Sequence, residues 1–125
     1  MKSKKKVLVV DDEPHMVKLI EAIFDAEGIE VICSYNGEDA LNIINKKKPD
    51  LILLDIMMPI MSGFDVCEEL RSNPKTKDLK IIFLTALKLS AIDKSYLRKL
   101  KSLAYITKPF ENDELVVKVK KYLEI

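Results

Sequence analysis

The chain has 125 residues, of which 48% are hydrophobic and 33% are charged, a composition typical of one globular domain. The length excludes two full domains, so we treat residues 1–125 as a single domain. Lys and Arg number 21 and Asp and Glu number 20, so the net charge of +1 provides no general attraction for nucleic acid or an anionic membrane.

Short apolar runs alternate along the chain with segments in which apolar residues recur at helical spacing. The runs lie at 7–10, 31–33, 51–54, 81–84 and 103–106, and several are rich in β-branched residues, as in strands buried on both faces. The first helical segment begins at Pro14 and stops at Gly28, as those residue types favour. The later four follow candidate capping residues: Asn36, Ser62, Ser90 and Asn112.

This strand–helix alternation occurs five times and predicts a doubly wound α/β domain. We expect a five-stranded parallel sheet with right-handed crossovers and helices on both faces. In such a sheet, ligands bind just beyond the carboxyl ends of the strands. The residues at those ends are therefore the candidates for function.

Charged and polar side chains stand at four of these strand ends. Asp11 and Asp12 follow the first strand, Asp55 the third, Thr85 the fourth and Lys108 the fifth. Three carboxylates close together repel one another, and a hard cation such as Mg²⁺ relieves that repulsion while keeping waters that a phosphoryl oxygen can replace. An ammonium and a hydroxyl at the same edge suit a phosphoryl group, so the pattern predicts phosphoryl transfer to a carboxylate.

Each of these residues also has an ordinary structural interpretation. Asp11 and Asp12 could cap the first helix, and Asp55 could be only a polar strand end. Thr85 could be a β-branched strand residue, and Lys108 a solvated surface charge. Only their shared position at one edge favours a functional site.

The two cysteines give evidence on the compartment. Cys33 and Cys67 have no metal-ligand spacing and are too few for a secreted disulfide framework. The chain start, MKSKKKVLVVDDEP, has too short an apolar run for a signal peptide, and no run approaches the ~20 apolar residues that span a bilayer. We therefore expect a cytoplasmic protein without membrane contact.

Four strings, VLVVDDEP, DLILLDIMMPIMSGFDV, IIFLTAL and YITKPF, resemble in order the receiver domain of two-component response regulators. The resemblance extends from about Lys6 to Leu123 and implies the strand order 2-1-3-4-5, an order of the flavodoxin-like fold for which such a receiver is a known example. It also implies that Asp55 accepts a phosphoryl group from a sensor histidine kinase or a phosphotransfer protein. Such a domain is a phosphoacceptor, not an enzyme in the ordinary sense.

The same resemblance assigns roles to the other residues of the site. Asp12, Asp55 and the backbone carbonyl of Met57 would bind Mg²⁺ or Mn²⁺ directly, and Asp11 would act through water. Thr85 would hydrogen-bond the phosphoryl group and Lys108 would pair with it. The resemblance also implies that Tyr105 turns inward on activation and that the Lys108–Pro109 peptide is cis. The partners implied are a downstream effector protein or fused effector domain, and a phosphorylation-dependent homodimer.

The sequence departs from the family in three places: one loop, the apolar residues Met57 and Leu87, and the end of the chain. Lys101-Ser102-Leu103-Ala104 stands where a Gly-Ala pair is usual, so we expect altered geometry between the fourth helix and the fifth strand. The chain stops at Ile125 without an effector, and two interpretations stay open: a single-domain regulator or a fragment of a longer one.

Three functions of other classes are alternatives to a phosphoacceptor. A flavodoxin-like electron carrier would need a Ser-, Thr- or Gly-rich phosphate loop, and the DDEP sequence would repel a flavin phosphate. A phosphohydrolase with an aspartate nucleophile would need a second acid two residues later, where Met57 stands. A pseudo-receiver that acts only through protein contacts, without phosphorylation, is the remaining alternative.

Overall fold

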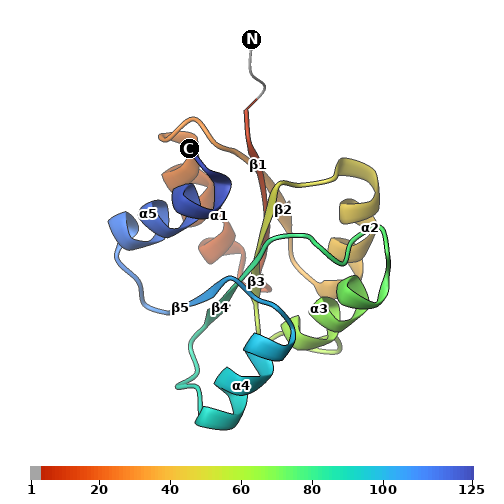
Figure 1. Ribbon diagram of the computed structural model, residues 1–125. Helices are drawn as coiled ribbons and strands as arrows, with labels where there is room; N and C mark the ends of the chain where they lie inside the picture. The colour runs from red at the N-terminus through yellow and green to blue at the C-terminus, as the bar shows by residue number, and fades with distance from the viewer. Residues whose placement is uncertain (1–3) are drawn as a thin grey trace.

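The computed structural model describes residues 4–125 and consists of one parallel sheet between two layers of helices (Figure 1). The strands are β1 (Lys6–Val10), β2 (Glu30–Ser34), β3 (Leu51–Asp55), β4 (Ile81–Thr85) and β5 (Ala104–Thr107). The helices are α1 (Pro14–Asp25), α2 (Gly37–Lys47), α3 (Gly63–Ser72), α4 (Ala91–Lys99) and α5 (Asn112–Leu123). The strand order is β2-β1-β3-β4-β5, and every pairing is parallel. The predicted fold class is confirmed.

The core has one half on each face of the sheet. Helices α1 and α5 cover one face, where Val17, Phe24 and Leu115 pack on alternate strand residues such as Val9 and Leu53. Helices α2, α3 and α4 cover the other face. Strands β3 and β4 are buried along their whole length, which explains their continuous apolar sequences.

Most of the predicted helix starts are confirmed. Asn36, Ser62 and Ser90 each accept a hydrogen bond from a backbone N–H in the first turn of the next helix. Asn112 is not a cap: it is the first residue of α5, and Glu111 precedes it without a side-chain capping bond. The predicted end of the first helix is also confirmed: α1 extends to Asp25, and Gly28 closes its C-terminus with φ of 74°. The N–H of Gly28 donates to the carbonyl of Asp25, and the N–H of Ile29 donates to that of Phe24.

The fifth strand is also shifted from its predicted position. It begins at Ala104 and ends at Thr107, whereas the apolar run starts at Leu103. Leu103 is exposed, and its N–H donates to the carbonyl of Ile81. Leu103 is therefore bonded to β4 but lies just before β5 begins. Apolar character alone does not mark this strand boundary.

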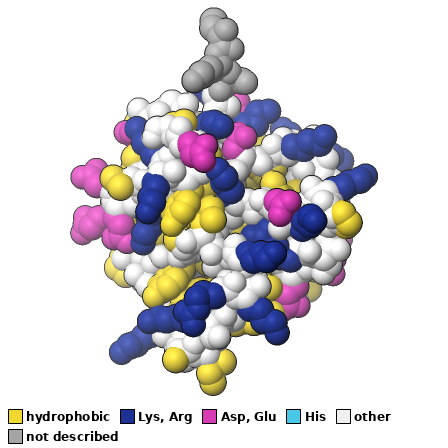
Figure 2. Space-filling view, viewed as in Figure 1, with side chains coloured by type: hydrophobic (Ala, Val, Ile, Leu, Met, Phe, Trp, Pro, Cys, Tyr) yellow, Lys and Arg dark blue, Asp and Glu magenta, His cyan; other side chains and the backbone are white. Residues whose placement is uncertain are grey.

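The outer surface carries charges of both signs. On the face shown in Figure 2, Lys and Arg side chains are spread over the view, with Asp and Glu among them. Within residues 4–125, no helix has the length and apolar character needed to cross a membrane.

Candidate functional site

The sheet brings the candidate residues to one edge. Asp55 and Thr85 are the last residues of β3 and β4, whereas Asp11 directly follows β1 and Lys108 directly follows β5. Asp55 lies beside Leu84 in the β3–β4 register, and Thr85 lies beside Thr107 in the β4–β5 register. Because all strands are parallel, these ends meet on the same side of the molecule.

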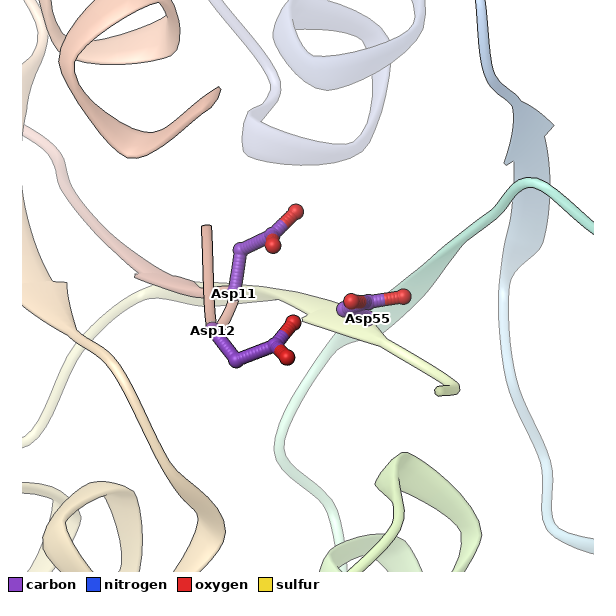
Figure 3. A group of neighbouring side chains, drawn as sticks. All are labelled: Asp11, Asp12 and Asp55. Carbon is purple, nitrogen blue, oxygen red and sulfur yellow. The ribbon is translucent and has the colours of Figure 1, made fainter. Parts of the chain in front are cut away.

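Three carboxylates form the centre of this site (Figure 3). One oxygen from each of Asp11, Asp12 and Asp55 lies within 4.8 Å of the others. Asp11 and Asp55 are buried, with 0% and 3% of their surfaces exposed, whereas Asp12 is exposed. Three carboxylate oxygens at this separation could hold a metal ion, with Asp12 on the solvent side.

The Asp55 carboxyl is electrostatically unfavourable in its ionised form. Its pKa is raised to about 6, first by burial and then by the negative charge of Asp11. Lys108 and the N–H of Met57, which donates to Oδ1 of Asp55 at 3.2 Å, only partly oppose this rise in pKa. A bound cation would stabilise the ionised form that a nucleophile needs.

Lys108 supplies the positive charge of the site. Its Nζ donates to Oδ2 of Asp11 at 2.5 Å and lies 3.7 Å from Oδ2 of Asp55. Burial would lower the pKa of this ammonium, but the hydrogen bond to Asp11 and the charge of Asp55 outweigh burial and raise it. The ammonium therefore lies beside two of the three carboxylates. The Lys108–Pro109 peptide is cis, as expected.

Thr85 and Tyr105, the other two predicted residues, have different environments. Thr85 is completely buried, and its Oγ1 accepts the N–H of Leu87 at 2.9 Å. Tyr105 is half-buried on β5 and lines two surface cavities, one beside α5 and one beside α4. The structure thus places Thr85 at the edge with the carboxylates and Tyr105 nearer the outer surface.

Helix capping, the ordinary structural interpretation of Asp11, accounts for only one of its hydrogen bonds. Oδ1 of Asp11 accepts the N–H of Glu13 at 2.9 Å, just before α1, so Asp11 does support the helix start. Its other oxygen is bound by Lys108, which a cap does not require. Capping alone therefore does not explain the buried pair.

Gly63 is a residue of the site that the sequence analysis did not identify. A Cβ atom at Gly63 would lie 2.2 Å from the backbone oxygen of Asp55, so only glycine lets α3 begin so close to the end of β3. The N–H of Gly63 also donates to the carbonyl of Ile56 at 2.9 Å. The signal in the sequence was a glycine directly after a helix-capping serine, which we interpreted only as a helix start.

Comparison with known proteins gives matches across nearly the whole chain. A family model described as the response regulator receiver domain matches residues 7–120. A Francisella response regulator receiver domain is 33% identical, with a TM-score of 0.87 and coverage of 97% of this chain and 98% of that one. The chemotaxis protein CheY4 of Vibrio cholerae is 27% identical, with a TM-score of 0.89 and coverage of 96% and 99%.

A third similar structure is a receiver domain that belongs to a histidine kinase. It is the signal receiver domain of a signal transduction histidine kinase from Syntrophus aciditrophicus, 28% identical with a TM-score of 0.86. The match covers 96% of this chain and 90% of that one. The residues that the family model matches, 7–120, include the strand ends that carry the carboxylates and the lysine.

Proposed function

Because the chain belongs to the response regulator receiver domain family, we propose that Asp55 is its phosphoacceptor and that residues 1–125 act as one receiver domain. A receiver of this family is a signalling domain that accepts phosphate and not a classical enzyme. The observation that carries the proposal is the position of Asp55: a buried carboxylate of raised pKa, 3.7 Å from the ammonium of Lys108. Its acidic pocket with Asp11 and Asp12 is consistent with a phosphoacceptor.

The reaction we propose is transfer of a phosphoryl group from a phosphohistidine of a histidine kinase or phosphotransfer protein. An oxygen of Asp55 forms a bond to phosphorus while the nitrogen–phosphorus bond breaks, and the electron pair stays on the imidazole nitrogen. Lys108 pairs with the phosphoryl oxygens, and the hydroxyl of Thr85 hydrogen-bonds one of them. Asp55 must be ionised to attack, so the raised pKa makes a compensating positive charge important.

The donor set fits Mg²⁺ or Mn²⁺. Hard divalent cations take carboxylate and carbonyl oxygens, and the pocket has an excess of carboxylates over ammonium groups. Asp12, Asp55 and the backbone carbonyl of Met57 would hold the ion directly, and Asp11 would act through water. When bound, the ion would neutralise charge on the carboxylates and on the transferred group.

The response to phosphorylation is proposed to pass from Thr85 to Tyr105. Thr85 is drawn to the phosphoryl group, and Tyr105 then turns inward from the surface between α4 and α5. A downstream effector protein, a fused effector domain or a second copy would read this change. Hydrogen exchange around residues 90–105 should change on beryllofluoride binding, and an unchanged pattern would contradict this route.

The phosphoacceptor assignment is tested with phosphoramidate as the donor. We expect the intact mass to increase by one phosphoryl group in the presence of Mg²⁺ and to stay unchanged after chelation. Asp55→Asn should abolish the increase, and the matched variant Asp78→Asn, at an exposed acid, should keep it. A folded, unmodified chain under these conditions would support the alternative, a pseudo-receiver that acts only through protein contacts.

A further inference from the structure

Basic side chains gather at the amino edge of the sheet, opposite the carboxylate pocket. Because each helix runs antiparallel to the strands, the helices begin at the carboxyl edge and end at the amino edge. The first turns of α2, α3, α4 and α5 carry acids, and the last turns of the same helices carry bases. The net charge of +1 is therefore the sum of an acidic edge and a basic edge, and the basic edge can attract an anion on its own.

One corner of the amino edge is especially rich in lysine. This lysine corner consists of residues 4–6 at the start of β1, residues 46–48 at the end of α2 and residues 73–79 in the loop between α3 and β4. It contains eight lysines: Lys4, Lys5, Lys6, Lys46, Lys47, Lys48, Lys75 and Lys77. The acids on or beside these segments are Glu30, Asp50 and Asp78. These acids and the negative ends of two helix dipoles, each about half a charge, leave an excess of about four positive charges.

The three segments of the lysine corner lie together in the fold. The N–H of Asp50 donates to the carbonyl of Lys6 at 2.8 Å, so the chain that follows α2 lies against the start of β1. Lys48 and Lys75 line one surface cavity of about 380 Å³, between the end of α2 and the α3–β4 loop. In Figure 2, dark blue side chains lie at the upper right, over the end of α2 in Figure 1. Lysines from segments far apart in the sequence therefore line one groove.

The fold positions these lysines without neutralising them. Within residues 4–125, none of the eight has a carboxylate at ion-pair distance. The side chain of Asn73 accepts the N–H of Lys75 at 3.0 Å, and Arg71 donates to the carbonyl of Lys77 at 2.7 Å, so the loop backbone is fixed. Lys48 follows α2 in the left-handed conformation, with φ of 46°, where glycine would avoid the strain. The helix dipole of α2 gives a structural reason for its last-turn lysines but not for those of the α3–β4 loop.

The chemistry of the lysine corner favours a phosphate backbone over other anionic surfaces. Its segments contain no aromatic residue, so the bases of a single strand would have no side chain to stack on. None of the large hydrophobic side chains exposed within residues 4–125 lies on these segments, so the corner has no such side chain to insert into a bilayer. The backbone of a duplex needs only cations, and it is a ridge that fits a groove with lysine on two sides.

We propose that the lysine corner binds the phosphate backbone of double-stranded nucleic acid, without sequence preference. The corner adjoins the start of β3, and Asp55 is the last residue of that strand, about 13 Å away along it. A bound duplex therefore leaves the carboxylate pocket open, and binding does not depend on phosphorylation of Asp55. Phosphates repel the acidic carboxyl edge, so the domain approaches a duplex with its amino edge first.

The test is fluorescence anisotropy of a short labelled DNA duplex of mixed sequence, titrated with the unchanged chain at several salt concentrations. We expect a dissociation constant of about 10⁻⁵ M at low salt, as for non-specific binding. The logarithm of the association constant should fall with the logarithm of the salt concentration with a slope of about −3.6, which corresponds to about four phosphate contacts. Absence of binding at low salt would overturn the proposal.

The double variant Lys48→Gln with Lys75→Gln removes the charge from both sides of the groove. Its affinity should fall about tenfold at low salt, and the salt slope should decrease by about two, since each lost phosphate contact contributes about one. The control is Lys88→Gln with Lys94→Gln, at exposed lysines before and within α4, which changes the net charge equally and should keep the affinity within about twofold. Circular dichroism checks that both double variants are folded. An equal loss in the two would overturn the proposal, because net charge alone would then explain binding.

Three further probes test the kind of anion. A single strand of the same sequence should bind more weakly than the duplex, and a duplex of another sequence should bind equally. Vesicles of phosphatidylcholine and phosphatidylserine should not bind at the salt concentration at which the duplex binds. A single strand that binds as tightly as the duplex, a clear preference between the two duplexes, or binding to vesicles in place of DNA would each overturn the proposal.

Discussion

Two of the loops that hold a bulky residue in the left-handed conformation have opposite surroundings. Lys101, between α4 and β5, has φ of 60°, and Ile60, between β3 and α3, has φ of 70°. The α4–β5 loop is held by hydrogen bonds that a side chain of another helix, α3, donates to its carbonyls. The second is held by its own turn and has its side chain in solvent.

Arg71 of α3 provides the support at the first loop. Its guanidinium donates to the carbonyls of Leu100 and Lys101 at 2.8 and 3.2 Å, and to those of Lys77 and Leu79 at 2.7 and 2.8 Å. The carbonyls of the two residues that follow α4 are thus bound by one side chain. The departure from the usual Gly-Ala pair is accommodated here, because Ala104 still pairs with Ile82 in the sheet.

A second contact joins α3 to α4 nearby. The hydroxyl of Tyr96 donates to Glu68 of α3, and the Tyr96 ring packs edge-on against Phe64 at 5.2 Å between centroids. Polar and strained groups in this junction are therefore satisfied within the chain. At the carboxylate edge, no group of the described chain compensates the excess negative charge or buries the exposed, strained isoleucine. Unfavourable groups without internal compensation thus indicate where an ion or a partner binds.

The largest expected effect comes from removing the internal support. Arg71→Ala should lower the free energy of unfolding by about 3 kcal/mol, because several charge-assisted hydrogen bonds to carbonyls are lost together. Urea denaturation measures this. Arg98→Ala, at an exposed arginine of α4, is the control and should change stability by less than about 0.5 kcal/mol. A small effect of Arg71→Ala would show that the α3–α4 junction does not depend on this residue.

Because the negative charge of the acidic pocket is not compensated, the free energy of unfolding should depend on pH. The folded pKa of Asp55 is about 6, against about 3.9 in an unfolded chain, so the folded state keeps a proton that the unfolded state has lost. This contribution is fully present below about pH 4 and is lost as the pH rises through 6, and it amounts to at most about 3 kcal/mol.

The measurement is the free energy of unfolding against pH in the presence of a chelator, for the unchanged chain and for Asp55→Asn. Other carboxylates titrate in the same range, so the contribution of Asp55 is the difference between the two curves. We expect the unchanged chain to lose stability relative to Asp55→Asn between pH 4 and 6. Parallel curves would contradict the raised pKa.

The sequence predicted the sheet, the strand order and the residues at the carboxyl edge because these depend on local patterns and on one topological rule. Asp11 and Asp55, far apart in the chain, meet because parallel strands end together. The sequence did not predict the role of Arg71 or the conformation of Ile60. Arg71 acts through backbone carbonyls of two segments, the α3–β4 and α4–β5 loops, and the strain at Ile60 depends on a φ angle that side-chain patterns do not encode.

Divalent cation should compensate the charge in the pocket. Mg²⁺ at about ten times its dissociation constant should stabilise the fold by about 1.4 kcal/mol, measured as a rise in melting temperature. Asp12→Ala should remove most of this rise, and Asp25→Asn, at an exposed acid at the end of α1, should keep it. An undiminished rise in Asp12→Ala would place the cation elsewhere.

The smallest effects compare the two left-handed residues directly. Ile60→Gly should stabilise the domain by about 1 kcal/mol and Lys101→Gly by about 0.5 kcal/mol, because glycine removes the left-handed penalty but adds entropy to the unfolded chain. The gain is larger for Ile60 because its side chain is branched at Cβ. Thermal and urea unfolding measure both, and a loss of stability in Ile60→Gly would mean that its side chain has an intramolecular partner.

Repeating Lys101→Gly in the Arg71→Ala background shows whether the guanidinium holds the loop. With Arg71 present, the bound carbonyls keep Lys101 in its left-handed conformation, so glycine relieves a real cost. Without Arg71, the loop can relax to a conformation that lysine tolerates, and the gain from glycine should shrink toward zero. Because the two residues contact each other, such non-additivity is expected. A gain of equal size in both backgrounds would show that the backbone, and not Arg71, fixes this conformation, and the contrast with Ile60 would then lose its physical basis.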